Sequence, residues 1–142
     1  MAKGESTCAS CREMFSFELI HNGLNDTCYA YCGTCGTCAL FDYPYQKPEC
    51  QPHWQNALPA SSELLAFAKR CDCGGIFDAN AIPRCPHCFA ALSATELTPA
   101  IETASFGTSV DWGCQGSWDG PYSFVTNGRL TENPWRKARR PI

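Results

Sequence analysis

The chain has 142 residues, a net charge of −3 and 12 cysteines, together with 11 glycines and 10 prolines. Few of its residues are Leu, Ile or Val, so the composition excludes a domain held by a large apolar core and favours one stabilised by metal ions or disulfides. No run approaches the roughly 20 apolar residues of a membrane span, and residues 1–5 lack the apolar stretch of a secretory signal. We therefore expect a cytoplasmic protein with no membrane contact, whose close cysteine pairs bind metal.

The charge is unevenly distributed along the chain. Residues 129–142 carry five basic side chains against Glu132 alone, whereas residues 1–128 have a net charge of −7. An acidic body gains no general attraction to phosphate backbones. Only the C-terminal tail could supply such an attraction.

Residues 1–41 predict two strands joined by a turn. Residues 15–19 alternate between apolar and polar side chains, as a half-buried strand does. Asn22-Gly23 is a good hairpin signal, and residues 28–31 suit a second strand. This region therefore predicts a hairpin between two cysteine pairs.

Residues 42–60 predict an extended connector, because their four prolines exclude a regular helix. Residues 61–70 then predict a helix, with a serine available as its cap, Glu63 in its first turn and two basic residues in its last. This helix runs directly into the third cysteine pair, so residues 61–92 are expected to form a second unit.

Residues 93–142 predict a segment rich in glycine and aromatic residues with a basic tail. Residues 93–102 suit a short helix that breaks or restarts at Pro99. Residues 122–125 and 129–131 flank Asn127-Gly128, which predicts a C-terminal β-hairpin.

Eight of the cysteines fall into four close pairs: Cys8 and Cys11, Cys32 and Cys35, Cys71 and Cys73, and Cys85 and Cys88. A short spacer lets the chain turn and direct two sulfurs at one metal ion, and two such pairs complete a tetrahedral site. Neighbours along the chain are the simplest partners. We therefore predict one zinc ion on the first two pairs and one on the last two, with iron or disulfides as alternatives.

Two segments resemble the zinc-ribbon superfamily, with its rubredoxin-like four-cysteine knuckles. Residues 71–77 (Cys-Asp-Cys-Gly-Gly-Ile-Phe) and 83–88 (Pro-Arg-Cys-Pro-His-Cys) carry the resemblance most clearly, and it extends over residues 8–38. It implies a small, metal-stabilised, mostly β protein with two zinc-ribbon-like units, one short helix and the C-terminal β-hairpin. It implies no activity, since ribbons occur in enzymes, transcription factors and adaptors alike.

Four further cysteines leave alternatives open. Cys28, Cys38 and Cys50 with His53 could form a third metal site, or they could be buried thiols and a surface imidazole. Cys114 lacks a base near it in sequence, which argues against a nucleophile. Carboxylates also flank aromatic residues, at Asp111, Trp112, Trp118 and Asp119. These residues could form a sugar-binding site, or the aromatic rings could belong to a small β core.

Two functions fit these observations. The first is a non-catalytic zinc protein that binds another protein, because saturated four-thiolate sites have no open metal position. The second is binding of nucleic acid through the tail, whose stacking and basic residues are Trp135, Arg136, Lys137, Arg139 and Arg140. An enzymatic function has less support, because the sequence has no phosphate-binding loop, serine-hydrolase elbow or dinucleotide fingerprint.

Overall fold

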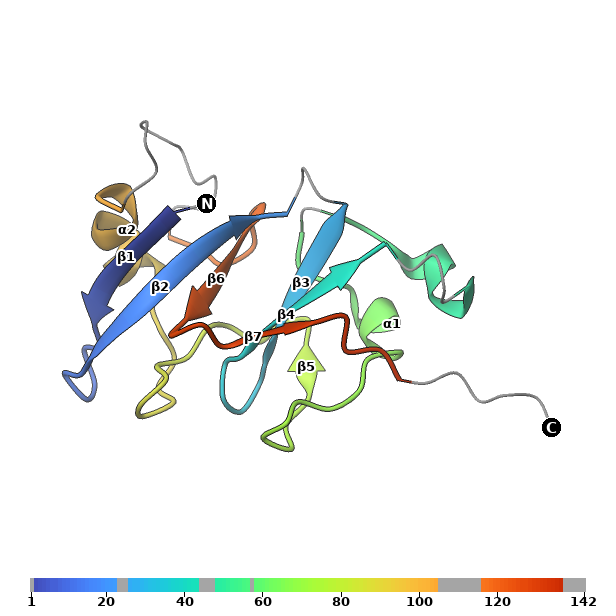
Figure 1. Cartoon of the computed structure of the whole chain (residues 1–142), viewed down its shortest axis with the longest axis horizontal. Coiled ribbons are helices and arrows are strands. Elements are labelled where there is room, and N and C mark those ends of the chain that lie inside the picture. Colours follow the sequence, from blue (N-terminus) through green and yellow to red (C-terminus); the bar gives the residue numbers. More distant parts are fainter. Residues whose placement is uncertain (1, 23–25, 44–47, 57, 105–115, 137–142) are drawn as a thin grey trace.

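The computed structural model describes residues 2–22, 26–43, 48–56, 58–104 and 116–136. The chain is mostly β, as expected, and forms a three-stranded sheet of order β1-β2-β6 and a four-stranded sheet of order β5-β3-β4-β7 (Figure 1). The strands are β1 (Ala2–Thr7), β2 (Met14–His21), β3 (Thr27–Cys32), β4 (Cys38–Asp42), β5 (Phe77–Asp78), β6 (Tyr122–Thr126) and β7 (Leu130–Glu132). The helices are a 3-10 helix (Pro48–His53), α1 (Ser62–Leu65) and α2 (Ala94–Glu102).

Strand β2 forms where alternation predicts it, but the prediction that β2 and β3 pair as a hairpin is wrong. Strand β2 instead pairs antiparallel with β1 and with β6, while β3 lies in the other sheet. Asn22 explains part of this difference, because it is fully buried and its backbone and side-chain N–H groups both donate to the Pro121 carbonyl, at 2.9 and 3.2 Å. The residue predicted to turn the chain therefore anchors the end of β2 beside β6.

Strands β3 and β4 separate two apolar clusters. Cluster 1 lies on the face that carries Tyr29 and Tyr31, and it includes the inward side chains of the three-stranded sheet and of α2. Cluster 2 lies on the other face, which carries Cys28 and Ala30, and it includes Leu64 of α1. Every residue of β3 is buried, so this strand is the central element of the fold.

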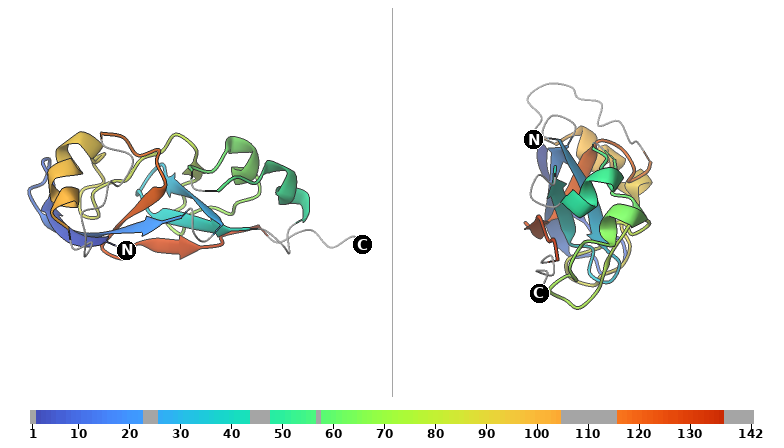
Figure 2. Two further views of the ribbon diagram at one scale, coloured as in Figure 1. Left: turned by 90° about the horizontal axis from the view of Figure 1, so that it is seen from above. Right: turned by 90° about the vertical axis from the view of Figure 1, so that its right-hand side faces the viewer.

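The helices lie on one side of the strands (Figure 2). Helix α1 is shorter than predicted, because beyond it Ala68 forms a bridge with Trp135 and the Lys69 N–H donates to the Pro134 carbonyl. Helix α2 forms where a short helix was predicted over residues 93–102, but it continues through Pro99 without the predicted break. Among the described residues, no helix combines the length and apolar character needed to cross a membrane.

The C-terminal strands form on either side of the predicted tight turn, in which Asn127 and Gly128 have φ values of 49° and 70°. The two strands do not pair with each other as a hairpin. Strand β6 joins β2 in one sheet, and β7 lies parallel to β4 in the other. The turn therefore carries the chain from one sheet to the other.

Candidate metal centres

The eight paired cysteines gather into two groups of four. The outer group is Cys8, Cys11, Cys85 and Cys88, and the inner group is Cys32, Cys35, Cys71 and Cys73. Within each group all sulfurs lie within 4.8 Å of one another. The predicted grouping by neighbours along the chain is wrong: the first pair joins the fourth, and the second joins the third. Each site is thus shared between the N-terminal and central parts of the chain.

The spacing of the sulfurs fits a tetrahedral metal ion. In the outer group the Cys8–Cys88 and Cys11–Cys85 Sγ distances are both 3.7 Å. In the inner group Cys32–Cys73 and Cys35–Cys71 are separated by 3.5 and 3.7 Å. Four sulfurs at about 2.3 Å from a central ion are about 3.8 Å apart. A disulfide would need about 2.05 Å, so these groups are built for an ion and not for cross-links.

All four cysteine loops repeat one backbone design. The N–H of the first cysteine donates to a carbonyl four or five residues later, at 2.9–3.0 Å. The residue after the second cysteine has a positive φ, which turns the chain back on itself; these residues are Arg12, Gly36, Gly74 and Phe89, at 64°, 77°, 91° and 60°. Backbone N–H groups in these loops also point at sulfurs, such as those of Thr34 to Cys32, Gly75 to Cys73 and His87 to Cys85. These bonds stabilise thiolate charge.

The four loops lie along one edge of the molecule. From left to right in Figure 1 they are the loops that contain residues 8–11, 85–88, 32–35 and 71–73. The two middle loops belong to different groups and touch, since a Cβ on Gly36 would lie 2.4 Å from the Arg84 backbone nitrogen. Glycine is required there for close approach as well as for its positive φ. The two candidate metal centres are therefore packed against each other.

Arg129 bridges these two middle loops. Its guanidinium donates to the Cys35 carbonyl at 2.7 Å and to the Arg84 carbonyl at 3.0 Å, and it also donates to the Thr126 hydroxyl. Four thiolates around one divalent ion carry a charge of −2, so a fixed cation beside both groups is favourable. Nothing in the sequence marks Arg129 for this position, because it lies 41 residues beyond the last paired cysteine.

Replacing Arg129 with lysine is expected to lower the free energy of unfolding of the metal-loaded chain by about 1.5–3 kcal/mol, because an ammonium cannot span both carbonyls. Metal transfer to a chromogenic chelator should also become faster. Chemical unfolding and transfer kinetics measure the two effects. Arg12→Lys is the matched control, since the Arg12 side chain is exposed. Equal behaviour of the two variants would show that Arg129 does not tie the loops together.

Each group contains one thiol that ionises easily. The Cys11 backbone N–H contributes most to lowering the pKa of Cys8, to about 6. Burial acts to raise the pKa of Cys35, but the hydroxyl and N–H of Thr37 outweigh it and lower that pKa to about 7. Burial raises the pKa of Cys71 to about 12. A divalent ion supplies the charge needed to ionise the remaining thiols, so metal binding releases protons.

His87 lies between Cys85 and Cys88 and is exposed. Its Nε2 donates to the Met14 carbonyl at 2.9 Å, which ties the fourth cysteine loop to the start of β2. Cys73 and Cys88 are the two exposed cysteines of the groups, one in each. Each candidate centre is therefore partly buried, with one exposed cysteine in each group and a half-buried Cys11 in the outer one.

The other sequence candidates are not brought together. Within the described part of the chain, no metal-sized group includes Cys28, Cys38, Cys50 or His53. Cys38 lies in cluster 1, whereas Cys28 and Cys50 lie in cluster 2 across the sheet. Burial raises the pKa of both Cys28 and Cys38 to about 12, so these thiols stay protonated.

The aromatic residues named from sequence have separate positions. Trp135 packs against Phe41 with ring centroids 4.8 Å apart, and Trp118 packs against Phe124 at the same distance. The candidate residues Asp111, Trp112, Cys114, Lys137, Arg139 and Arg140 lie outside the described residues. Binding of nucleic acid by the tail thus stays a prediction.

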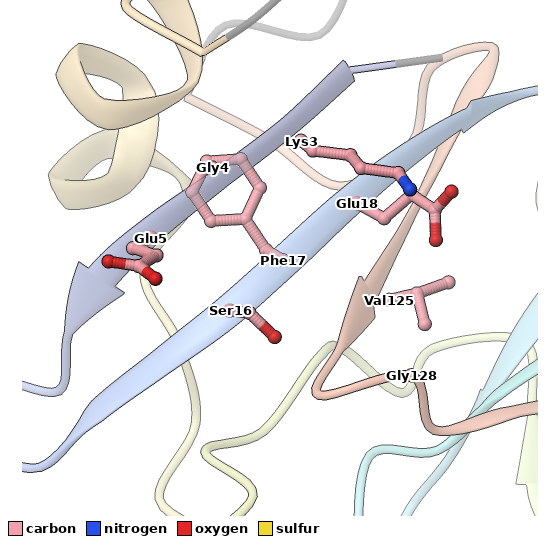
Figure 3. Close-up of a pocket in the computed structure, with 8 residues that line it drawn as sticks. All are labelled: Lys3, Gly4, Glu5, Ser16, Phe17, Glu18, Val125 and Gly128. Carbon is pink, nitrogen blue, oxygen red and sulfur yellow. The ribbon is translucent and has the colours of Figure 1, made fainter.

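A shallow hollow of about 400 Å³ lies on the three-stranded sheet (Figure 3). Lys3 and Glu5 project from β1, and Ser16 and Glu18 project from β2. Its lining contains neither cysteine nor histidine, so it offers no ligand set like those at the loop edge.

Comparison with known proteins gives a family. No curated protein and no solved structure matches the chain. One family model, described as "Domain of unknown function (DUF8255)", matches residues 4–94, which is more than half of the chain and includes all eight grouped cysteines. Strands β6 and β7 and Arg129 follow the matched range. The chain is therefore a member of the DUF8255 family.

Proposed function

We propose that this chain is a non-catalytic zinc protein of the cytoplasm, with two structural four-cysteine sites, and that it acts by binding another protein. The observation that carries this proposal is the gathering of eight thiols into two sets with tetrahedral spacing. Four thiolates saturate a tetrahedral ion and leave no position for a substrate.

Zinc and rubredoxin-like iron both accept four tetrahedral thiolates. Zinc is proposed because it is the usual ion of closed structural sites in small loop-rich proteins. Metal analysis of the purified chain, with visible absorption to detect iron, separates the two ions.

The loop edge also displays apolar side chains, which supports a protein partner. Met14, Ile76 and Phe89 are 61%, 52% and 48% exposed, and each follows a paired cysteine by one to three residues. Exposed apolar side chains of this size can make contacts with a partner protein. Rigid loops held by metal ions would present them without a large ordering cost.

Capture of a partner from native lysate tests this proposal. The metal-loaded chain is expected to retain a stoichiometric protein partner, and the double variant Met14→Ser/Phe89→Asn is expected to lose it. Asparagine suits position 89 because it tolerates the positive φ there. Leu58→Ser is the matched control, because Leu58 is 50% exposed but lies away from the cysteine loops in sequence.

Removal of residues 137–142 should leave capture unchanged if the body binds the partner. Loss of capture with this truncation, or equal capture by the double variant and the control, would contradict a role for the loop edge.

A further inference from the structure

A small cavity of about 220 Å³ opens beside β3 and β5, apart from the grouped cysteines. Its apolar walls include Tyr31, Pro59, Ile82 and Trp118, and two carboxylates, Asp78 and Asp119, also line it. Cavities for drug-sized ligands begin at about 300 Å³, so this one suits a single side chain or a similarly small group.

Hydrogen bonds fix the walls in place. The Tyr31 hydroxyl accepts from the Phe124 N–H at 2.9 Å, and the Trp118 indole donates to the Leu92 carbonyl at 2.9 Å. The Tyr29 hydroxyl bonds to the Trp118 and Gly120 carbonyls, which holds the segment that carries Asp119. The cavity is therefore formed before any ligand arrives.

The two carboxylates have acceptor capacity to spare. Asp78 accepts the Asn80 backbone N–H at 2.8 Å, and Asp119 accepts the Ser117 hydroxyl. No basic side chain lines the cavity, and within the described ranges neither carboxylate has an ion-pair partner. Two uncompensated negative charges beside apolar walls attract a cation that also has an apolar stem.

We propose that this cavity receives an arginine side chain of the partner protein. The inference rests on the partner-binding function proposed above and adds the chemistry that the partner must present. A planar guanidinium supplies five donors for the two carboxylates and stacks on an indole ring. Its aliphatic stem matches Pro59 and Ile82 in the wall. A lysine ammonium would offer neither the stacking nor the fork of donors.

Titration of the metal-loaded full chain with a blocked Gly-Arg-Gly tripeptide tests this assignment. In proton–nitrogen NMR spectra, the Trp118 indole signal and the Ala79 and Asp119 amide signals should shift progressively. A blocked tripeptide with citrulline in place of arginine keeps the shape but not the charge, and it should bind at least about tenfold more weakly.

Asp78→Asn and Asp119→Asn should each weaken binding of the arginine tripeptide about tenfold. The asparagine amide can still accept the hydrogen bond from Asn80 or Ser117, but it has lost the negative charge. Asp26→Asn makes the same change in net charge at an exposed carboxylate outside the cavity and should have no effect. Absence of shifts, equal binding of citrulline, or an equal effect of Asp26→Asn would overturn the assignment. None of these results changes the outcome of the capture experiment. Failure of this inference can therefore be distinguished from failure of the proposed function.

Discussion

Removal of both metal ions is expected to unfold the chain. A structural zinc site contributes about 10–16 kcal/mol of binding free energy at neutral pH, whereas a whole domain is stable by only about 5–15 kcal/mol. The two groups join the N-terminal strands to residues 71–88, so without ions these regions are held together only by the short β3–β5 pairing, a few hydrogen bonds and the apolar clusters. Under reducing conditions, an excess of strong chelator should abolish the near-ultraviolet circular dichroism of the tryptophans.

Readdition of zinc to the stripped chain is the control, and it should restore the signal. Because each group binds its ion as thiolates, refolding should release protons into a weakly buffered solution. A metal-free sample that keeps its near-ultraviolet signal would show that strand pairing and the apolar clusters suffice to fold the chain without metal.

Local patterns predicted local structure well. Alternation identified β2, the Asn127-Gly128 pair identified a tight turn with two positive φ values, and a serine, Ser61, caps α1 as predicted. Local patterns did not predict which strands pair with each other. Strand β1 has few apolar residues, and Asn22-Gly23 resembles a turn although Asn22 is a buried anchor.

The spacing of the cysteines identified the eight thiols that gather, but not their grouping. Cys11 and Cys32 are separated by 20 residues and Cys11 and Cys85 by 73, yet this difference in loop length changes the closure free energy by only about 1 kcal/mol. Chain proximity is therefore a weak guide compared with the packing of whole strands. We call the observed arrangement, in which the first pair joins the fourth and the second joins the third, the nested grouping. Two features favour it over the sequential one. Strand β3 is buried on both faces and lies in a different sheet from β2, and the Gly36 loop contacts Arg84.

The nested grouping predicts which pairs of cysteine replacements act on one ion. Cys8→Ser and Cys85→Ser should each leave one metal ion in the native mass spectrum, held by the inner group. The double variant Cys8→Ser/Cys85→Ser should also keep one ion, because the second replacement falls on a site already lost. Cys8→Ser/Cys32→Ser should lose both ions, since it removes one ligand from each group.

A sequential grouping would reverse these two double variants, with Cys8→Ser/Cys32→Ser keeping an ion and Cys8→Ser/Cys85→Ser keeping none. Cys38→Ala is the matched control and should keep both ions, because Cys38 is buried in cluster 1 outside the groups. The comparison needs a competing chelator at a concentration where the unmodified chain holds two ions, since a site with three thiolates still binds weakly. Under that condition the ion count reports the grouping directly, because a doubly altered site and a singly altered site are equally empty.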